Sequence, residues 1–340
     1  MDPLMKILRR CNQGSILLSA AMVAIGSLGF GAASGETVTI HELEGKLRIE
    51  IGGKLFTEYL FADTPKPICY PVIGPQGLAM TRNYPMKRGV AGESKDHPHH
   101  RSLWFTHGEV NGISFWHESE AAGQIVHEEL LKLESGSARA TIQSRARWVG
   151  PDGKAVCTDT RTMGFEAAAE GRIIDFEITV HASHGKLTFG DTKEGTMGIR
   201  THPNLRLSNN PEHGVTTANG QAINSEGHRD KDLWGKRAKW VDYWAEIKGH
   251  VVGVAIFDHP DNPRHPTWWH ARDYGLVAAN PFGVHNFEKK PKGTGDLVIP
   301  AGDSVTFRYR FLFHEGDADQ AKIADLYRRY TEQLRSAPAN

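Results

Sequence analysis

S-V-T-F-R-Y-R-F-L-F, residues 304–313, is the stretch that decides the fold. Its large apolar side chains fall at every second position, and threonine or arginine falls between most of them. Successive side chains of a β-strand point to opposite faces of a sheet, so this alternation predicts a strand with one buried face and one wetted face.

Other strands of this kind precede that stretch. The alternation recurs at residues 46–51, 139–147 and 174–180, and residues 251–257 are continuously apolar, as in a strand covered on both faces. After residue 317, apolar residues at helical spacing predict one amphipathic helix. With 36 glycines and 17 prolines to break the chain into short elements, we predict an all-β protein. We expect one large antiparallel β-sandwich domain that spans residues 36–340 and ends in this helix; two domains are the alternative.

The first 35 residues have the order of a secretory signal peptide. Lys6, Arg9 and Arg10 precede an apolar stretch over residues 16–30, and small residues follow up to Gly35. We expect cleavage near Gly35 and an exported, periplasmic or extracellular protein, by the general or the twin-arginine route. A retained membrane anchor is the alternative. No later apolar run reaches the roughly 20 residues that cross a bilayer as a helix, so we expect no membrane span after cleavage.

Charge and cysteine content narrow the partners. Forty Lys plus Arg balance forty Asp plus Glu, so we expect no nucleic acid to bind. Signal removal leaves Cys69 and Cys157, either as a disulfide or as two buried thiols. Two cysteines cannot form a structural zinc site built on sulfur. No pattern in the sequence defines the oligomeric state.

Histidine is over-represented, with 18 in the chain, and it is the side chain that titrates near neutrality and binds metals most readily. The first polar cluster is D-H-P-H-H-R-S-L-W-F-T-H-G-E-V-N-G-I-S-F-W, residues 96–116. The alternative to a functional site here is a surface loop of hydrogen-bonding side chains above packed tryptophans. The candidates are His107 and Glu109 for catalysis, Arg101 and Trp104 for substrate binding, and His97, His99 and His100 for a metal.

Three later segments carry similar clusters. Residues 198–205 place polar side chains at alternate positions, hence on one face of an extended chain. Residues 224–244 are rich in tryptophan, which suits the apolar faces of sugars, although a solvated charged hairpin is the alternative. Residues 257–287 hold three closely spaced prolines, which predict a rigid loop on a sheet scaffold. The catalytic candidates are His202, Asp258 and His270, and the substrate-binding candidates are Arg200, Asn204, Lys236, Trp240, Arg272, Asn280 and His285.

A divalent metal is a further hypothesis. The three neighbouring histidines at 97, 99 and 100 can supply nitrogen ligands, with Glu109 or Asp258 as an oxygen ligand, a set that suits zinc, manganese or iron. On a strand, His97 and His99 share one face and His100 points to the other, so the third ligand stays open.

Several motifs resemble a secreted family of unknown function that carries the label "PmoA family". They are DHPHHRSLWFTHGEVNG, NSEG, WGKRAKWVDYW, AIFDHPDNPRHPTWWHARDYGLVAANPFG and LVIPAGDSVTFRYRFLFHEG, and the resemblance covers nearly all of residues 45–330. The label borrows the name of a membrane subunit of methane monooxygenase, and we expect this β-rich chain not to be that subunit.

The order of motifs is also similar to that of aldose 1-epimerases and other galactose mutarotase-like enzymes. Y-P-V-I-G-P at 70–75, H-G at 107–108 and T-H-P-N-L at 201–205 come before a strand that follows P-A-G-D. The resemblance implies a large β-supersandwich in which His107 and His202 act on a sugar. It places Asn280-Pro281 where those enzymes have a Glu-Pro pair with the catalytic base, and an amide cannot accept a proton.

Two functions follow as expectations. The first is an exported carbohydrate-active enzyme that acts on a sugar, oxidised sugar or glycoside by acid-base chemistry, as an epimerase, lyase or hydrolase. The second is a carbohydrate-binding module of the same fold without catalysis. In either case, we expect the loops that carry His107, His202, His270 and Asn280 to converge on one face of a sheet. Arg101, Arg200 and Arg272 should join them, paired by Glu109, Asp258 or Asp273, with any unpaired guanidinium left for the ligand.

Overall fold

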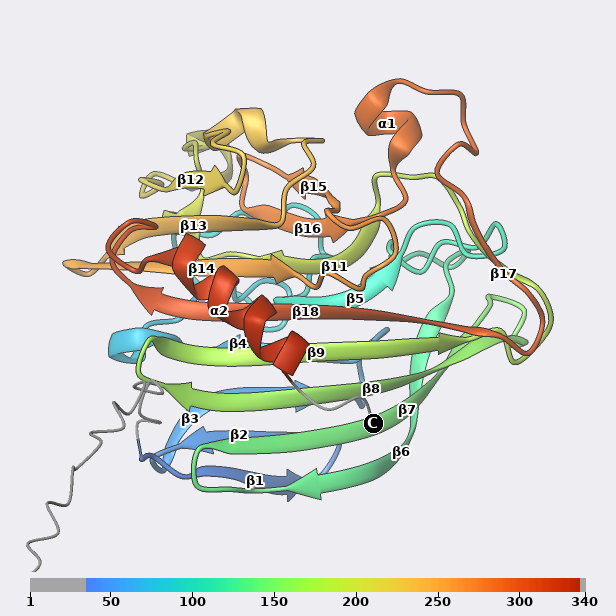
Figure 1. Cartoon of the computed structure of the whole chain (residues 1–340), viewed down its shortest axis with the longest axis horizontal. Coiled ribbons are helices and arrows are strands. Elements are labelled where there is room, and N and C mark those ends of the chain that lie inside the picture. The colour runs from blue at the N-terminus through green and yellow to red at the C-terminus, as the bar shows by residue number, and fades with distance from the viewer. Residues whose placement is uncertain (1–34, 337–340) are drawn as a thin grey trace, which may run out of the picture. The chain divides into compact units, whose positions relative to one another are not determined.

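The computed structural model describes residues 35–336, which belong to one compact unit (Figure 1). Residues 1–34, which contain nearly all of the predicted signal peptide, lie outside the described residues. No helix between residues 35 and 336 is long and apolar enough to cross a membrane.

Two antiparallel sheets of eight strands form the molecule. Sheet I has the order β1 (Val38–Leu43), β2 (Lys46–Ile51), β3 (Lys54–Leu60), β4 (Ile68–Val72), β5 (Leu103–His107), β11 (Gly195–Arg200), β16 (Leu276–Asn280), β15 (Trp268–Ala271). Sheet II has the order β12 (Gln221–Asn224), β13 (Trp240–Ile247), β14 (His250–Asp258), β18 (Ser304–Glu315), β9 (Gly171–His181), β8 (Ala155–Ala168), β7 (Arg139–Val149), β6 (Gln124–Glu134). A two-stranded sheet pairs β10 (Leu187–Phe189) with β17 (Leu297–Ile299), and the α-helices are α1 (Val284–Glu288) and α2 (Ile323–Ser336).

The main hydrophobic core lies between the two large sheets. Aromatic rings of sheet I meet rings of sheet II across it, as in the edge-to-face contact of Phe56 with Phe165 and the stacking of Phe105 on Phe176. Such contacts bind the two sheets through apolar burial and favourable ring geometry. The predicted antiparallel β-sandwich with a C-terminal helix is therefore confirmed.

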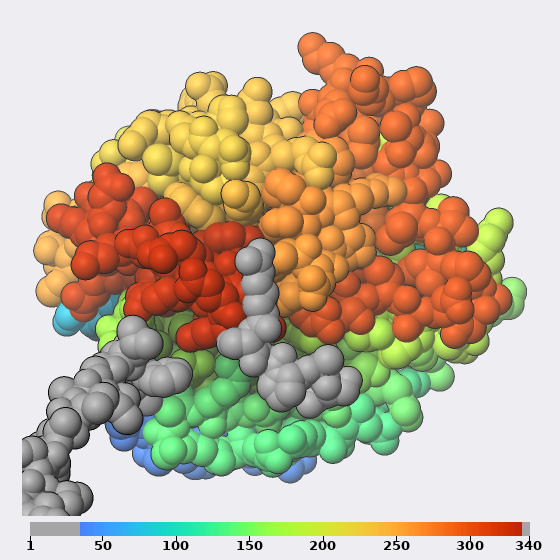
Figure 2. All heavy atoms as spheres, in the orientation of Figure 1, coloured from blue at the N-terminus to red at the C-terminus, as the bar shows by residue number. Residues whose placement is uncertain are grey.

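The strand that decides the fold, β18, lies in the middle of sheet II. Phe307, Phe311 and Phe313 belong to the core between the sheets, as the alternation predicts. Its other face is not wetted along its whole length. Leu312 packs under α2, and the Arg310 guanidinium lies 4.6 Å from the centre of the Tyr330 ring of that helix. Figures 1 and 2 show α2 lying across this outer face of sheet II.

Candidate functional site

A straight row of residues crosses the outer face of sheet I, the face turned away from the main core. Trp104 of β5 pairs with Gly198 of β11, Gly198 pairs with Ala278 of β16, and Ala278 pairs with His270 of β15. Directly opposed residues of antiparallel strands share one face of the sheet. Two very small residues therefore separate a tryptophan from a histidine on this face.

The indole of Trp104 lies over Gly198. A Cβ atom at position 198 would come within 3.0–3.3 Å of three atoms of that indole, so glycine gives the ring its room. Trp116 and His100 complete a group of three rings. Their centres form a nearly equilateral triangle with sides of 5.4 to 5.5 Å, and all three side chains are buried. We call these three residues the ring triangle.

Each member of the ring triangle has an N–H without an acceptor. Arg200 Nη1 donates to His100 Nδ1 at 3.0 Å, so the neutral imidazole carries its proton on Nε2. Burial, followed by the charge of Arg200, lowers the pKa of His100 well below its usual range, which keeps the ring neutral. His100 Nε2, Trp104 Nε1 and Trp116 Nε1 have no hydrogen-bond partner within the described part of the chain. Buried donors without acceptors are uncommon in folded proteins.

A stack of rings continues from the triangle toward the hairpin between β15 and β16. His97 lies nearly parallel to His100, with ring centres 4.7 Å apart, and to Tyr274, with ring centres 5.0 Å apart. The guanidinium groups of Arg200 and Arg272 lie 4.8 and 5.3 Å from the centre of the Tyr274 ring. Cations are attracted to the electron-rich face of an aromatic ring, so Tyr274 helps to hold both arginines.

Asp96 holds two arginines beneath this stack. Its Oδ1 accepts from Arg82 Nη1 at 2.5 Å and from Arg200 Nη2 at 2.7 Å. Burial alone would raise the pKa of Asp96. The contact with His97 and the charges of Arg200 and Arg82 outweigh burial and hold that pKa well below its usual range. One carboxylate therefore serves two cations.

Glu118 plays the same part on the other side of the ring triangle. Its carboxylate accepts from Lys66 Nζ at 2.7 Å and from Arg101 Nη2 at 2.8 Å. Lys66 is only 1% exposed, and burial lowers its pKa to about 8 against the opposing charge of Glu118. This group also contains two cations and one anion.

His270 is held in one orientation at the far end of the row. Its Nδ1 donates to the backbone oxygen of Lys193 at 2.7 Å, which leaves the lone pair on Nε2. Among residues 35–336, the hydrogen bond to Lys193 is the one that the His270 ring makes, so Nε2 has no partner there. Burial lowers the pKa of His270 to about 4, although the negative charge of Glu194 opposes the shift. His270 is thus a neutral, oriented base at neutral pH.

Ionisable residues bridge the gap between His270 and the ring triangle. Glu194 pairs with Lys193 and lies in the electrostatic field of His270 and of the exposed His117. The His117 ring centre is 4.9 Å from that of His99. Burial, followed by the charge of His117, lowers the pKa of His99 to about 3. The outer face of sheet I therefore gathers acid-base groups from several separate segments.

The structure brings eight of the sequence-predicted residues together on this outer face. Their roles remain predictions, but their proximity follows from the pairings above. They are His97, His99, His100, Arg101, Trp104, Arg200, His270 and Arg272. Asn280 lies at the end of the adjacent strand, where its Oδ1 accepts from two backbone amides and its Nδ2 donates to the Thr192 oxygen at 3.0 Å.

His107 and His202 do not meet. His107 lies on the core side of sheet I among Phe189 and Phe282, and its Nε2 donates to the Gly190 oxygen at 2.8 Å. His202 follows the opposite end of β11 and caps the 3-10 turn Pro203–Leu205, where its Nδ1 accepts from the Asn204 amide. Since β11 rises about 3.3 Å per residue, the two histidines are too far apart to act on one sugar ring. The convergence of these two residues, expected from the sequence, is therefore wrong.

Other predicted residues also lie away from the outer face of sheet I. Asp258 is fully buried, and its two oxygens hold the proline-rich loop through Asn262, His265 and the Thr267 amide. Trp240 packs beneath α2 on sheet II. The remaining four make contacts elsewhere: Glu109 with Lys292, Asn204 with the Glu246 oxygen, the exposed Lys236 through its backbone, and His285 with the Lys290 oxygen.

The expected carboxylate partners of the arginines also differ. Arg101 pairs with Glu118 and Arg200 with Asp96, rather than with Glu109, Asp258 or Asp273. No regular spacing in the sequence links each arginine to its carboxylate partner. Only the loop path, which no local pattern encodes, brings each pair together.

The three neighbouring histidines are not arranged as a coordination sphere. His97 and His100 are stacked with an angle of 3° between their rings, so their in-plane lone pairs cannot point at one ion. Within residues 35–336 no group of three or more His, Cys, Asp or Glu side chains could hold a metal ion. Cys69 and Cys157 are both buried free thiols, so of the two alternatives the disulfide is not formed.

Sequence reasoning left several outer-face residues out of its candidates. Tyr274 could have been found, since it follows His270 and Arg272 at alternate positions. Trp116 stood in the first cluster without a role. Glu118, Glu194 and His117 have no signal in the sequence, because they reach the site through loops.

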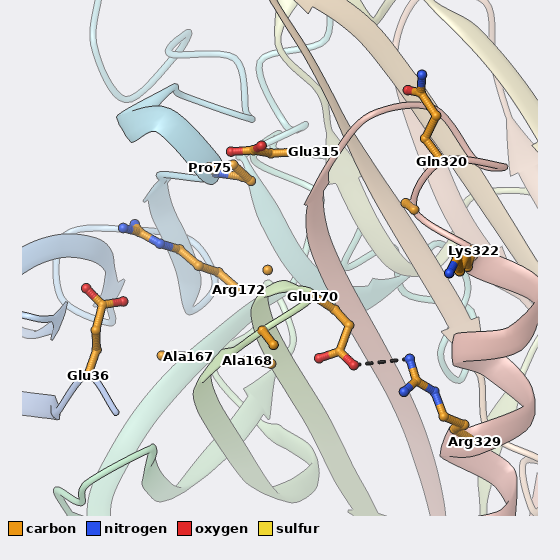
Figure 3. Close-up of a pocket in the computed structure, with 13 residues that line it drawn as sticks. Glu36, Pro75, Ala167, Ala168, Glu170, Arg172, Glu315, Gln320, Lys322 and Arg329 are labelled. Carbon is orange, nitrogen blue, oxygen red and sulfur yellow. Dashed lines mark hydrogen bonds and ion pairs between the residues drawn. The ribbon is translucent and has the colours of Figure 1, made fainter. Parts of the chain in front are cut away.

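A separate cavity of about 630 Å³ lies beside α2 (Figure 3). Small residues of the turn between β8 and β9 line it, together with charged side chains of both signs, among them Glu170, which pairs with Arg329 at 3.1 Å. None of the predicted site residues lines this cavity.

Fold and outer face define an antiparallel β-sandwich protein with a polar, histidine-rich face on one sheet. Residues 46–328 match the model of the Family of unknown function (DUF6807), so the chain belongs to this family. No curated protein matches the chain.

Similar solved structures include a galactose mutarotase-like protein from Lactobacillus casei ATCC 334. It has 9% identity and a TM-score of 0.33, and the match covers 82% of this chain and all of that one. A Glycoside Hydrolase Family 97 enzyme in complex with acarbose from Pseudoalteromonas sp. strain K8 matches with 11% identity and a TM-score of 0.33, over 83% of this chain and 34% of that one. A polysaccharide lyase matches at 11% identity and a TM-score of 0.31, over 85% and 34% of the two chains. At these TM-scores we transfer no residue role.

Proposed function

We propose that the outer face of sheet I, between the ring triangle and His270, binds a carbohydrate and that the protein acts on it by proton transfer. The observation that carries the proposal is the state of His270. A backbone oxygen fixes the ring, burial keeps it neutral, and Nε2 has no hydrogen-bond partner among residues 35–336. A fixed, neutral imidazole with a free lone pair can accept a proton from a substrate.

Tyr274 supplies the matching acid. Burial raises the pKa of its phenol, and the nearby charges of Arg272 and Arg200 only oppose this shift, so the hydroxyl is protonated at neutral pH. His270 lies in β15, and Tyr274 lies in the turn that joins β15 to β16, so both belong to one hairpin. A base and an acid on one rigid hairpin suit proton removal and return at a sugar carbon, or proton transfer to a glycosidic oxygen. The reaction is then of the epimerase, lyase or hydrolase type.

The ring triangle accounts for the choice of a carbohydrate. Sugars present hydroxyl and ring oxygens that accept hydrogen bonds, together with apolar faces that pack on aromatic rings. The unpaired N–H groups of His100, Trp104 and Trp116 are donors of the kind that such oxygens can satisfy; because all three are shielded from solvent, the side chains above them must move for a sugar to reach them. The partly buried rings of Tyr70 and Tyr274, which pack against the same cluster, can supply the apolar contact.

The test is to incubate the purified protein with a panel of aldoses, uronic acids, 3-keto-glycosides and plant glycosides, and to follow ring and anomeric protons by NMR. We expect His270→Asn to reduce turnover at least about 100-fold. The asparagine amide can still donate to the Lys193 oxygen, but it cannot accept a proton. His181→Asn, a substitution on sheet II, is the matched control and should leave turnover unchanged. The proposal of an enzyme fails if no compound in the panel changes.

A carbohydrate-binding protein without turnover is the second candidate. The observation that favours it is the pKa of His270, about 4, because a general base works best with a pKa near the working pH. Calorimetry distinguishes the two candidates. A sugar that binds with heat release but is never converted, in the wild type or in any variant, identifies the binding protein.

We also propose that the protein is exported. The order of basic, apolar and small residues before Glu36 supports this. Mass spectrometry of the protein from a bacterial periplasm should show a chain that begins near Gly35. A chain that keeps residues 1–35 would contradict export by a cleaved signal.

A further inference from the structure

The outer face of sheet I carries more positive than negative charge. Asp96 is shared by Arg82 and Arg200, and Glu118 is shared by Lys66 and Arg101. Glu93 and Arg206 also belong to the first group, so each group keeps one positive charge in excess. Arg82, Arg200 and Lys66 are at most 2% exposed, so little solvent surrounds them to screen that charge.

Arg272 is the exception among the arginines of this face. Within the described residues its guanidinium makes no hydrogen bond and no ion pair, and its only contact of this kind is with the Tyr274 ring at 5.3 Å. The other arginines here, Arg82, Arg101 and Arg200, each bind a carboxylate at 2.5 to 2.8 Å. Arg272 therefore has all five of its N–H donors available.

We propose that the ligand of this site carries a carboxylate and that Arg272 binds it. The inference rests on the proposed function and narrows its substrate class to acidic sugars, such as uronic or aldonic acids. A guanidinium forms two parallel hydrogen bonds with a carboxylate, and the excess charge held at Asp96 and Glu118 adds long-range attraction. A neutral sugar has no carboxylate to pair with the guanidinium and no negative charge for the excess positive charge to attract.

The position of Arg272 also places the ligand relative to the base. Arg272 follows His270 at an alternate position, so both side chains belong to the outer face. A carboxylate held by Arg272 brings the carbons of a sugar acid that are next to it toward His270 Nε2 and the Tyr274 hydroxyl. The ring triangle, at the other end of the row, then faces the remaining hydroxyls.

The experiment compares matched pairs of sugars by isothermal titration calorimetry. D-galacturonate is paired with D-galactose, and D-glucuronate with D-glucose, at two concentrations of sodium chloride. We expect at least one acid to bind tenfold or more tightly than its neutral partner. Its affinity should fall as salt rises, while that of the neutral sugar should not change.

Three variants locate the preference. Arg272→Gln should abolish the difference between acid and neutral sugar, and Arg272→Lys should retain part of it, since lysine keeps the charge and loses the planar fork. Arg328→Gln on α2 removes the same charge from an exposed position far along the chain, and it should keep the full preference. Circular dichroism of each variant verifies that it is folded.

The outcomes separate this inference from the proposed function. Equal affinity for acid and neutral sugar, with either one converted, overturns the carboxylate and leaves the function in place. A preference for the acid that survives in Arg272→Gln overturns the role of Arg272. If none of the four sugars and no other uronic or aldonic acid binds, the carboxylate proposal falls, and the panel of glycosides decides the proposed function separately.

Discussion

The two sheets each have eight strands and a covered outer face, but their outer faces are built differently. On sheet II, α2 places Ile323, Tyr327 and Tyr330 over apolar residues, and Arg310 beneath it binds Asp175 at 2.7 Å. On sheet I, loops place histidines and tryptophans over the strands, and three buried N–H groups and Arg272 have no acceptor within residues 35–336. On sheet II the polar groups named here are paired, although Asp242 Oδ2 also lacks a partner among the described residues. On sheet I the unpaired groups are donors, which cost folding free energy and are consistent with the proposed ligand site.

The largest expected effect is on the covered face of sheet II. Asp242 and His314 are both buried, and His314 Nε2 lies 2.8 Å from Asp242 Oδ1. Asp242→Ala leaves the imidazole buried without its partner, so we expect the free energy of unfolding to fall by about 3–5 kcal/mol. Urea denaturation measures this loss.

Asp242→Asn is the control for that variant, because the amide oxygen still accepts from His314 and the loss should be smaller. Sugar binding should be unchanged in both variants at temperatures where they are folded. A loss of affinity without a loss of stability would show that the two outer faces are not separate in function.

The pH dependence of stability should have opposite signs on the two faces. Burial alone would lower the pKa of His314, but Asp242 outweighs it and raises that pKa. Its stabilising contribution is therefore complete below pH 6.5 and is lost as the pH rises through the raised value. His270 has a lowered pKa of about 4, so its contribution is complete above pH 6.5 and is lost as the pH falls toward 4.

The second prediction follows from this difference. Between pH 6.5 and pH 4, protonation of the unfolded chain at His270 should cost the wild type up to about 3 kcal/mol of stability. His270→Asn should remove that part of the pH dependence, as measured by urea denaturation across the range. Identical slopes for the two proteins would mean that His270 is not held neutral in the folded state.

The sequence was sufficient to predict the sandwich, because alternation over β2, β7, β9 and β18 records which face of each strand is buried. It also marked residues 96–101 and 270–272, which the structure places on the outer face of sheet I, through their histidine density. It could not show which residues converge. His107 and His202 sit in motifs of the expected order, yet β5 turns one toward the core and β11 ends before the other. Glu194 and Glu118 are set by loop paths that leave no local pattern.

The third prediction tests whether the row on sheet I depends on its small residues. Gly198→Ala puts a methyl group against the Trp104 indole at 3.0–3.3 Å, so the ring must shift. We expect sugar affinity to fall about tenfold and stability to fall by about 1–2 kcal/mol, as in an overpacked site. Calorimetry and urea denaturation measure the two effects.

Gly164→Ala in β8 is the matched control on sheet II. The new methyl group meets only the flexible end of the Arg139 side chain, which can move aside. Neither affinity nor stability should change by as much as in Gly198→Ala. Equal effects of the two substitutions would mean that replacing any strand glycine lowers affinity and stability. The small residues of the row on sheet I would then have no specific role in binding.

The smallest expected effect concerns a single N–H group of the ring triangle. Trp116→Phe keeps an aromatic ring and removes a donor that has no acceptor in the part of the chain that the structure describes, so any hydrogen bond lost is one to the proposed ligand. A hydrogen bond of this kind contributes about 1 kcal/mol, which corresponds to roughly fivefold in affinity. Trp148→Phe is the reverse case, because Trp148 Nε1 donates to Asp159 Oδ2 at 2.7 Å in the core. Trp148→Phe should reduce stability and leave affinity unchanged.

In ¹⁵N-labelled protein, the indole signals of Trp104 and Trp116 should shift when the sugar binds, while that of Trp148 stays in place. If the Trp148 signal shifts as much as theirs, the shifts report a general change in the protein rather than a binding site on sheet I.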